Sequence, residues 1–343
     1  MELKNIVIEE IRKRGPISFH EYMDFCLYHP RLGYYTSASE RIGKKGDYYT
    51  SAYIGRLFGQ VIAKQLEEMW RNMGQPNFDI VEYGAGSGLL CYDILFALKS
   101  NKNFFDKVTY HVIEKRPASL LSCIDNKVCF YSTIDELPLI EGCIISNELL
   151  DNFCVHRVIQ EKELMEVMVD HDQGRFRESL RPASNELKSY FRELDISLPE
   201  GYQTEVNLNA INWLKELSAH LRRGYVLTID YGYPSNELYG DHRSEGNLLC
   251  YHRHRVNTDP YANIGEQDIT THVNFSALRH WGTKYGLDLS GFTTQSFFLL
   301  GLGISQEAAK DPASVASPAL LKTLLVDLGN KMKVLIQEKN IFS

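Results

Sequence analysis

The sequence predicts an α/β fold, in which a mostly parallel, Rossmann-like sheet is covered by helices and extended by a helical N-terminal cap and a large insertion. Short apolar runs alternate with helical patterns from residue 76 onward, which is typical of a parallel sheet. These runs lie near residues 78–83, 109–113, 128–130 and 142–146. Buried runs at 224–230, 287–295 and 332–339 are expected to complete the sheet.

Residues 1–75 are predicted to form a helical cap that contributes to the active site, and residues 76–343 to form the core. Ser18 and Glu21 make a capping box for a helix that ends near Leu27. An apolar stripe at helical spacing predicts a long helix over 51–73. Further helices are expected at 207–222, 277–285 and 317–332.

Two insertions are predicted within the core, near residues 153–205 and 232–273, and together they are expected to form a subdomain on the substrate side. The first begins with a hairpin pattern over 153–170. The second is too long to be an ordinary connection, because loops of that length in compact proteins are usually functional or disordered.

Composition indicates a soluble globular protein. The chain has 343 residues, of which 44% are hydrophobic and 24% are charged, and its net charge is −7. That charge argues against a nucleic-acid partner held by electrostatics. We expect no signal peptide and no membrane insertion, because no long uninterrupted apolar run occurs. The seven cysteines form no C-x-x-C pair, which favours a reducing compartment and a cytoplasmic protein.

The stretch "FDIVEYGAGSGLL" at 78–90 carries the clearest motif. A strand ends in Glu82, and Gly84, Gly86 and Gly88 then precede a helix, whose N-terminus favours hydrogen-bond acceptors. The dinucleotide fingerprint G-x-G-x-x-G would need a third glycine at Leu89, so the motif is E-x-G-x-G-x-G instead. It resembles the first motif of class I S-adenosyl-L-methionine (SAM) methyltransferases, in which the acid serves the amino-acid end of the cofactor. The alternative is a glycine-rich turn without a ligand.

A second acid follows the next predicted strand. Glu114 ends the run at 109–113, where a carboxylate can accept hydrogen bonds from both hydroxyls of a ribose. We therefore expect Glu114 to bind the cofactor together with Glu82 and the three glycines.

The stretch "IISNELLD" at 144–151 places Asn147 and Glu148 where a parallel strand ends, and ligands of open α/β sheets bind outside such ends. If a helical turn begins there, Glu148 and Asp151 share one face. Two carboxylates suit a cationic substrate such as a guanidinium. The alternative is a helix start at which Asn147 is only the cap.

The histidines lack metal-ligand spacing, and we expect no metal. His254 and His272 are predicted to contact the substrate or to orient a carboxylate, with a purely structural role as the alternative. Gly46-Asp47 has no evident role in capping the helix that follows, which marks Asp47 as a candidate for the site.

Six strings occur in one order: "ISFHEYMDFCLYHPRLGYY", "GDYYTSAYIGRLFG", "VEYGAGSG", "NELLDNFCVHR", "LTIDYGY" and "GEQDITTHVNF". Together they resemble the MidA-like family of SAM-dependent methyltransferases, over nearly the whole chain. That family includes a mitochondrial complex I assembly factor that methylates an arginine of a complex I subunit.

The resemblance implies a class I methyltransferase fold and SAM as the cofactor. It places Asp47 near the cofactor and Asn147, Glu148 and Asp151 at the transfer site. Tyr231 of "LTIDYGY" is expected to contact the substrate, as His254 and His272 are. The large Tyr83 must then point away from the ligand. The mitochondrial member carries a targeting extension that we do not find here, so we expect a bacterial, cytoplasmic protein.

Three activities remain open from the sequence. A protein-arginine methyltransferase is the first choice, since two carboxylates favour a cationic acceptor on a partner protein. A small-molecule methyltransferase and a SAM-binding assembly factor without turnover are the alternatives. Neither the acceptor nor the oligomeric state follows from the sequence.

Overall fold

The computed structural model describes residues 2–37, 55–115, 127–310 and 318–341. The chain divides into two compact units. Unit 1 comprises residues 1–48, 151–212 and 232–278, and unit 2 comprises residues 49–150, 213–231 and 279–343. Each unit is described by itself.

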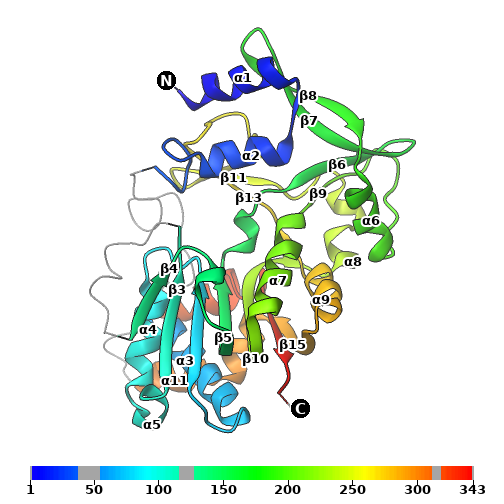
Figure 1. Ribbon diagram of the computed structural model, residues 1–343. Coiled ribbons are helices and arrows are strands. Elements are labelled where there is room, and N and C mark those ends of the chain that lie inside the picture. Colours follow the sequence, from blue (N-terminus) through cyan, green and yellow to red (C-terminus); the bar gives the residue numbers. More distant parts are fainter. Residues whose placement is uncertain (1, 38–54, 116–126, 311–317, 342–343) are drawn as a thin grey trace. The chain divides into compact units, whose positions relative to one another are not determined.

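Unit 2 contains the predicted sheet. Its strands are β2 (Phe78–Tyr83), β3 (Val108–Ile113), β4 (Val128–Tyr131), β5 (Ile140–Asn147), β10 (Leu221–Tyr233), β15 (Asp288–Thr294) and β16 (Met332–Lys339). They run in the order β15-β16-β10-β5-β2-β3-β4 (Figure 1). β16 is antiparallel to both of its neighbours, whereas β10, β5, β2, β3 and β4 are parallel.

The strand order reverses between β2 and β5, because β3 and β4 extend the sheet on one side of β2 and β5 lies on the other. Tyr83 at the end of β2 is in register with Ser146 near the end of β5, and Asn147 is in register with Ile229 of β10. The turns that follow these strands therefore emerge at one edge of the sheet. That edge, at the point of reversal, is where open α/β sheets bind their ligands.

Helices cover both faces of this sheet. On one face, α3 (Arg56–Asn72), α4 (Leu89–Leu98), α10 (Gln295–Gly301) and α11 (Ile304–Lys310) share a hydrophobic core with the strands. Gly59 allows the close approach of α3 and α4, because a Cβ there would lie 2.5 Å from the Cβ of Asp93. On the other face, Trp213 of α7 (Leu208–His220) packs edge-on against Tyr83. Shorter helical segments are α5 (Lys102–Phe105), α12 (Pro318–Lys322) and a π-helical turn at Thr323–Asp327.

Unit 1 is built from segments that are far apart in the sequence. Its N-terminal helices α1 (Leu3–Arg14) and α2 (Phe19–Tyr28) flank the short strand β1 (Ile17–Ser18), which pairs with β7. One sheet runs β1-β7-β6-β9, with β8 beside β7, and a smaller one runs β12-β11-β13. The bounds are β6 (His156–Gln160), β7 (Leu164–Asp172), β8 (Arg175–Pro182), β9 (Gln203–Val206), β11 (Leu249–His252), β12 (Arg255–Asn257) and β13 (Asp268–Thr270). Unit 1 also holds α6 (Asn185–Glu193), α8 (Ser235–Leu238), the short strand β14 (Val273–Asn274) and the start of α9 (Phe275–Lys284).

Most predicted elements are confirmed. All the predicted strands form, as do the capping box at Ser18 and the hairpin of β6 and β7. Two predictions need correction. The long helix begins at Arg56, with Gly55 as its N-cap, and residues 51–54 of the predicted range lie outside the described residues. The last predicted helix is shorter than expected, since helical structure spans 318–327 of the range 317–332. Residues 232–273, predicted as an insertion, contain strands and a short helix.

The domain boundary also differs from the predicted one. The cap was expected over 1–75, but α3 belongs to unit 2 because its apolar stripe packs into the core of the sheet. Residues 1–48 instead join the two insertions in unit 1.

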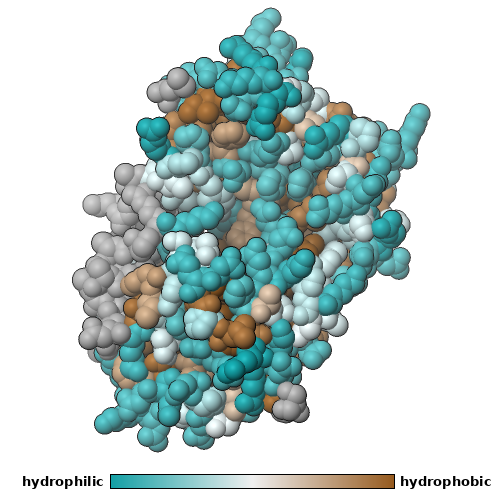
Figure 2. All heavy atoms as spheres, in the orientation of Figure 1, coloured by the Kyte–Doolittle hydropathy of each residue, from teal (hydrophilic) through white to brown (hydrophobic). Residues whose placement is uncertain are grey.

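No helix among the described residues is long and apolar enough to cross a membrane. Hydrophilic side chains predominate on the face shown in Figure 2, and hydrophobic ones form small, separate patches there.

Two glycines allow the central strands to approach each other. A Cβ on Gly142 of β5 would lie 2.0 Å from the carbonyl oxygen of Asp79, and one on Gly224 of β10 would lie 1.9 Å from the carbonyl oxygen of Gly142. Neither backbone atom can move without breaking the sheet.

We therefore predict that Gly142→Ala lowers the free energy of unfolding by about 3 kcal/mol, because the new methyl group overlaps main-chain atoms. Gly291→Ala in β15 is the matched control, since a Cβ there meets nothing within 4 Å, and it should change stability by less than about 1 kcal/mol. Denaturant titration measures both. Equal losses in the two variants would contradict the steric argument.

Candidate active site

The turn after β2 needs its three glycines. Gly84, Gly86 and Gly88 have φ angles of +68°, +54° and +80°, a region that side chains disfavour. The Gly88 amide donates to the carbonyl of Ala85 at 2.8 Å, and Gly88 is the N-cap of α4. The glycine turn predicted from the sequence is thus a tight turn that leads into a helix N-terminus.

The turn after β5 contacts this glycine turn. A Cβ on Gly84 would lie 2.7 Å from Cδ1 of Leu149. The segments that follow β2 and β5 therefore meet at the point where the strand order reverses.

Glu114 lies beside the same turn, at the end of β3. Its carboxylate accepts a hydrogen bond from the Gly86 amide at 3.1 Å, and its own amide donates to the carbonyl of Tyr131 at 3.2 Å. The structure therefore brings the second predicted acid and the glycine turn together.

Glu82 is buried in the sheet just before the turn. Its carboxylate accepts a hydrogen bond from the Tyr110 hydroxyl at 2.6 Å. Burial raises the pKa of Glu82 to about 7, the Tyr110 hydrogen bond opposes that rise, and the nearby Glu114 carboxylate adds to it. No lysine or arginine among the described residues forms an ion pair with Glu82. A buried carboxylate in these surroundings fits a ligand that brings an ammonium group.

Tyr83 and Glu82 are neighbours on a strand and so lie on opposite faces of the sheet. Tyr83 packs on Trp213, with ring centroids 5.7 Å apart. Tyr83 therefore points to the face of the sheet opposite the Glu82 side chain.

Asn147 and Glu148 lie together at the end of β5. The Asn147 side-chain amide donates to the Glu148 carboxylate at 3.4 Å, and Oδ1 of Asn147 is buried without a hydrogen-bond partner among the described residues. Glu148 has a φ of +51°, which is unusual for a residue other than glycine. The side chains of both residues are thus held at the edge that carries the glycine turn.

The helical turn that would place Glu148 and Asp151 on one face does not form. The left-handed backbone of Glu148 breaks it, and a 3₁₀-helix begins only at Leu150 (Leu150–Asn152). Asp151 is buried, is the first residue of the second segment of unit 1, and accepts the Thr271 amide at its carbonyl at 2.9 Å. The predicted helical spacing therefore does not place the Asp151 side chain beside that of Glu148.

Asp230 is a site residue that the sequence did not predict. This fully buried residue of β10 accepts hydrogen bonds at Oδ2 from the amides of Leu149 and Leu150, at 3.1 and 2.8 Å. The only signal in the sequence was an acid near the end of a buried strand, in "LTIDYGY".

The remaining predicted residues lie elsewhere. Tyr231 of β10 is half-buried against the core of unit 2. In unit 1, His254 is exposed in the turn between β11 and β12, whereas His272 follows β13 and lies 3.4 Å from the side-chain oxygen of Asn247. The register of β11 and β13 places the two histidines at opposite ends of that ladder. Asp47 lies outside the described residues.

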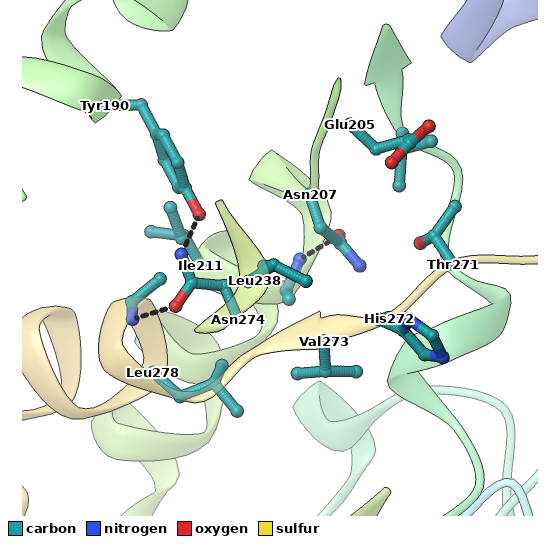
Figure 3. Close-up of a pocket in the computed structure, with 13 residues that line it drawn as sticks. Tyr190, Glu205, Asn207, Ile211, Leu238, Thr271, His272, Val273, Asn274 and Leu278 are labelled. Carbon is teal, nitrogen blue, oxygen red and sulfur yellow. Dashed lines mark hydrogen bonds between the residues drawn. The ribbon is translucent and has the colours of Figure 1, made fainter. Parts of the chain in front are cut away.

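His272 also lines a small cavity of mixed polar and apolar lining in unit 1 (Figure 3). The cavity volume is about 20 Å³, which suffices for about one water molecule. Beside it, the Tyr190 hydroxyl accepts a hydrogen bond from the Asn274 amide at 3.0 Å (Figure 3). Burial raises the pKa of Glu205, another residue of the lining, and its carboxylate accepts the Asn247 amide at 2.8 Å.

Comparisons with known proteins agree with the geometry of unit 2. Residues 61–293 match the sequence model of a family described as "putative S-adenosyl-L-methionine-dependent methyltransferase". A crystal structure from Burkholderia thailandensis, described as a "likely methyl transferase" bound to S-adenosyl-homocysteine, has a TM-score of 0.90 and 30% sequence identity. The similarity covers 99% of this chain and 92% of that one.

Curated relatives are more distant in sequence. The chain is 25% identical to the Drosophila melanogaster protein arginine methyltransferase NDUFAF7 homolog, mitochondrial, over 84% of this chain and 72% of the relative. It is 27% identical to the Danio rerio protein arginine methyltransferase NDUFAF7, mitochondrial, over 84% of this chain and 74% of the relative.

The raised pKa of Glu82 predicts a pH-dependent stability. The ordinary pKa of a glutamate is 4.5, and that of Glu82 in the folded protein is about 7. The folded protein therefore binds the proton more tightly than the unfolded chain, and this contribution to stability is lost as the pH rises from about 4.5 to about 7.

Glu82→Gln removes the titration and retains an acceptor for Tyr110. The variant should gain up to about 3 kcal/mol relative to the natural protein between pH 4.5 and pH 7.5, measured without cofactor by denaturant titration at both pH values. A stability difference that is independent of pH would contradict the assignment.

Proposed function

Because the chain belongs to this family of S-adenosyl-L-methionine-dependent methyltransferases, we propose that it transfers the methyl group to an arginine side chain of a partner protein. The cofactor is SAM, and the fold is the α/β fold of class I methyltransferases. The observation that carries the proposal is the position of Glu148, a carboxylate at the sheet edge whose turn contacts the glycine turn. The names of the curated relatives support an arginine acceptor.

The residues at this edge suit SAM. Glu82 would bind the ammonium group, Glu114 the ribose hydroxyls, and the turn of Gly84, Gly86 and Gly88 would allow close approach of the ligand. When bound, SAM would supply a methyl group carried on a positively charged sulfur. A nucleophile in line with the carbon–sulfur bond can take the methyl group, and S-adenosyl-homocysteine is the leaving group. The protein's contribution is to hold the acceptor nitrogen in that line and to provide the surrounding charges.

An arginine acceptor requires help from a carboxylate. A guanidinium has a pKa above about 12 and spreads its charge over three nitrogens, so each nitrogen is a weak nucleophile. A carboxylate on one side of the group concentrates the positive charge there and accepts the proton once transfer has begun. We assign this role to Glu148, and Asn147 fixes the orientation of its carboxylate through the hydrogen bond at 3.4 Å.

Other roles assigned from the sequence stay predictions. Asp151 is proposed as an orienting partner of the acceptor, and Tyr231, His254 and His272 as substrate contacts. Asp47 is proposed to lie near the cofactor.

Radiolabelled SAM identifies the acceptor class. The purified protein is incubated with methyl-labelled SAM in lysate from cells that lack the gene, and the labelled fraction is then hydrolysed and separated. We expect label in a protein band that yields methylarginine. Label in small molecules would replace the proposal with a small-molecule methyltransferase, and an unlabelled lysate would replace it with a SAM-binding assembly factor.

Glu148→Gln should lower turnover about 10²-fold, the usual scale for loss of a positioned acid–base group. It should leave the affinity for S-adenosyl-homocysteine within about threefold, because Glu82, Glu114 and the glycine turn remain intact. Glu141→Gln at the other end of β5 is the matched control, since Glu141 pairs with Arg222 and lies away from the edge. Normal turnover of Glu148→Gln would remove Glu148 from the mechanism.

A further inference from the structure

We infer that Asp230 is a positioning residue that holds Glu148 in place through the main chain. The inference rests on the proposed role of Glu148 in methyl transfer. Asp230 lies in the last part of β10, just beyond the residues that pair with β5, and the turn that it holds follows β5.

The Asp230 carboxylate binds consecutive amides of that turn. Oδ2 accepts the Leu149 amide at 3.1 Å and the Leu150 amide at 2.8 Å, and Oδ1 accepts the amide of Tyr231 at 2.8 Å. Asp230 is fully buried. Hydrogen bonds to a charged acceptor are shorter and stronger than neutral ones, and burial strengthens them further. The carboxylate therefore fixes the backbone immediately after Glu148.

Glu148 needs such a restraint. Its φ of +51° lies in the left-handed region, which residues with a side chain rarely occupy unless the surroundings enforce it. On one side the Glu148 amide donates to the carbonyl of Ile229 at 2.9 Å, and on the other the next two amides bind Asp230. All of these contacts connect the turn to β10.

The same turn also reaches the glycine turn. Leu149 gives its amide to Asp230, and its side chain occupies the space that a Cβ on Gly84 would fill. By fixing the backbone of this turn, Asp230 determines the direction in which the Glu148 side chain leaves the main chain, next to the glycine turn that we assign to the cofactor. If Asp230 only stabilised the fold, its substitution would lower activity to the same degree whether or not Glu148 was intact. The positioning role and the purely structural role can therefore be separated.

A double-mutant cycle separates them. Asp230→Asn should lower turnover about 10²-fold, with the affinity for S-adenosyl-homocysteine changed less than about threefold. In the Glu148→Gln background the same substitution should cost less than about threefold, because the group that Asp230 positions is already lost. Independent, multiplicative losses would overturn the inference.

Asp79→Asn is the matched control. Asp79 also accepts an amide of the neighbouring strand, that of Glu141 at 3.1 Å, but at the opposite end of β2 and β5. This variant should keep normal turnover. If Asp230→Asn does not fold, Asp230→Glu retains the charge and moves the carboxylate by one methylene, and it should show the same loss of turnover and the same non-additivity.

Amide hydrogen exchange tests the contact without any activity. Peptides that span residues 147–152 should exchange at least about tenfold faster in Asp230→Asn, because two amides lose a charged acceptor, and they should be unchanged in Asp79→Asn. Unaltered exchange in Asp230→Asn would refute the restraint itself. If the natural protein methylated nothing but the exchange changed as expected, the proposed function would fail and the restraint would stand.

Discussion

The parallel register of β2, β5 and β10 is the constraint on which the candidate site depends. It aligns Tyr83 with Ser146 and Asn147 with Ile229, so the turns that follow β2 and β5 emerge at one level, beside residues 229 and 230 of β10. Two glycines permit this close alignment, because a side chain on Gly142 or Gly224 would overlap the main chain of the neighbouring strand. If β5 slipped by one residue, its side chains would exchange faces. The Glu148 amide would then lose its hydrogen bond to the carbonyl of Ile229 on β10.

The chemistry of this edge follows from the carboxylates at the strand ends. Glu82 on β2, Glu114 after β3, Glu148 after β5 and Asp230 on β10 belong to adjacent strands. Main-chain amides donate to Glu114 and Asp230, and the Tyr110 hydroxyl donates to Glu82. These four carboxylates disfavour anions and suit positively charged ligands. SAM, with its sulfonium and ammonium groups, and a guanidinium are both of this kind. The raised pKa of Glu82 expresses the same imbalance, since burial and the nearby Glu114 both disfavour its charged form.

Local patterns predicted the sheet and the tight glycine turn after β2 well. Apolar runs of strand length located every strand of unit 2, and the positive φ angles of the three glycines are what their spacing implied. The turn after β5 could not be predicted in this way, because "NELLD" also suits the start of a helix. Asp230 was missed because its partners are 80 and 81 residues away and are set by strand pairing. The composition of unit 1 was missed for the same reason, since β1 pairs with β7, about 150 residues later.

The backbone of Glu148 connects structure and function most directly. A left-handed residue in a tight turn is ordinarily glycine, asparagine or aspartate, and a longer side chain there costs of the order of 1 kcal/mol. The Glu148 side chain accepts a hydrogen bond from the adjacent Asn147 and is not part of the hydrophobic core of unit 2. Asp230 and Ile229, which bind the main chain of this turn, are buried in the sheet. Glycine would adopt this backbone with less strain. A carboxylate at such a position, at the edge where the glycine turn lies, is what the role proposed for Glu148 in methyl transfer requires.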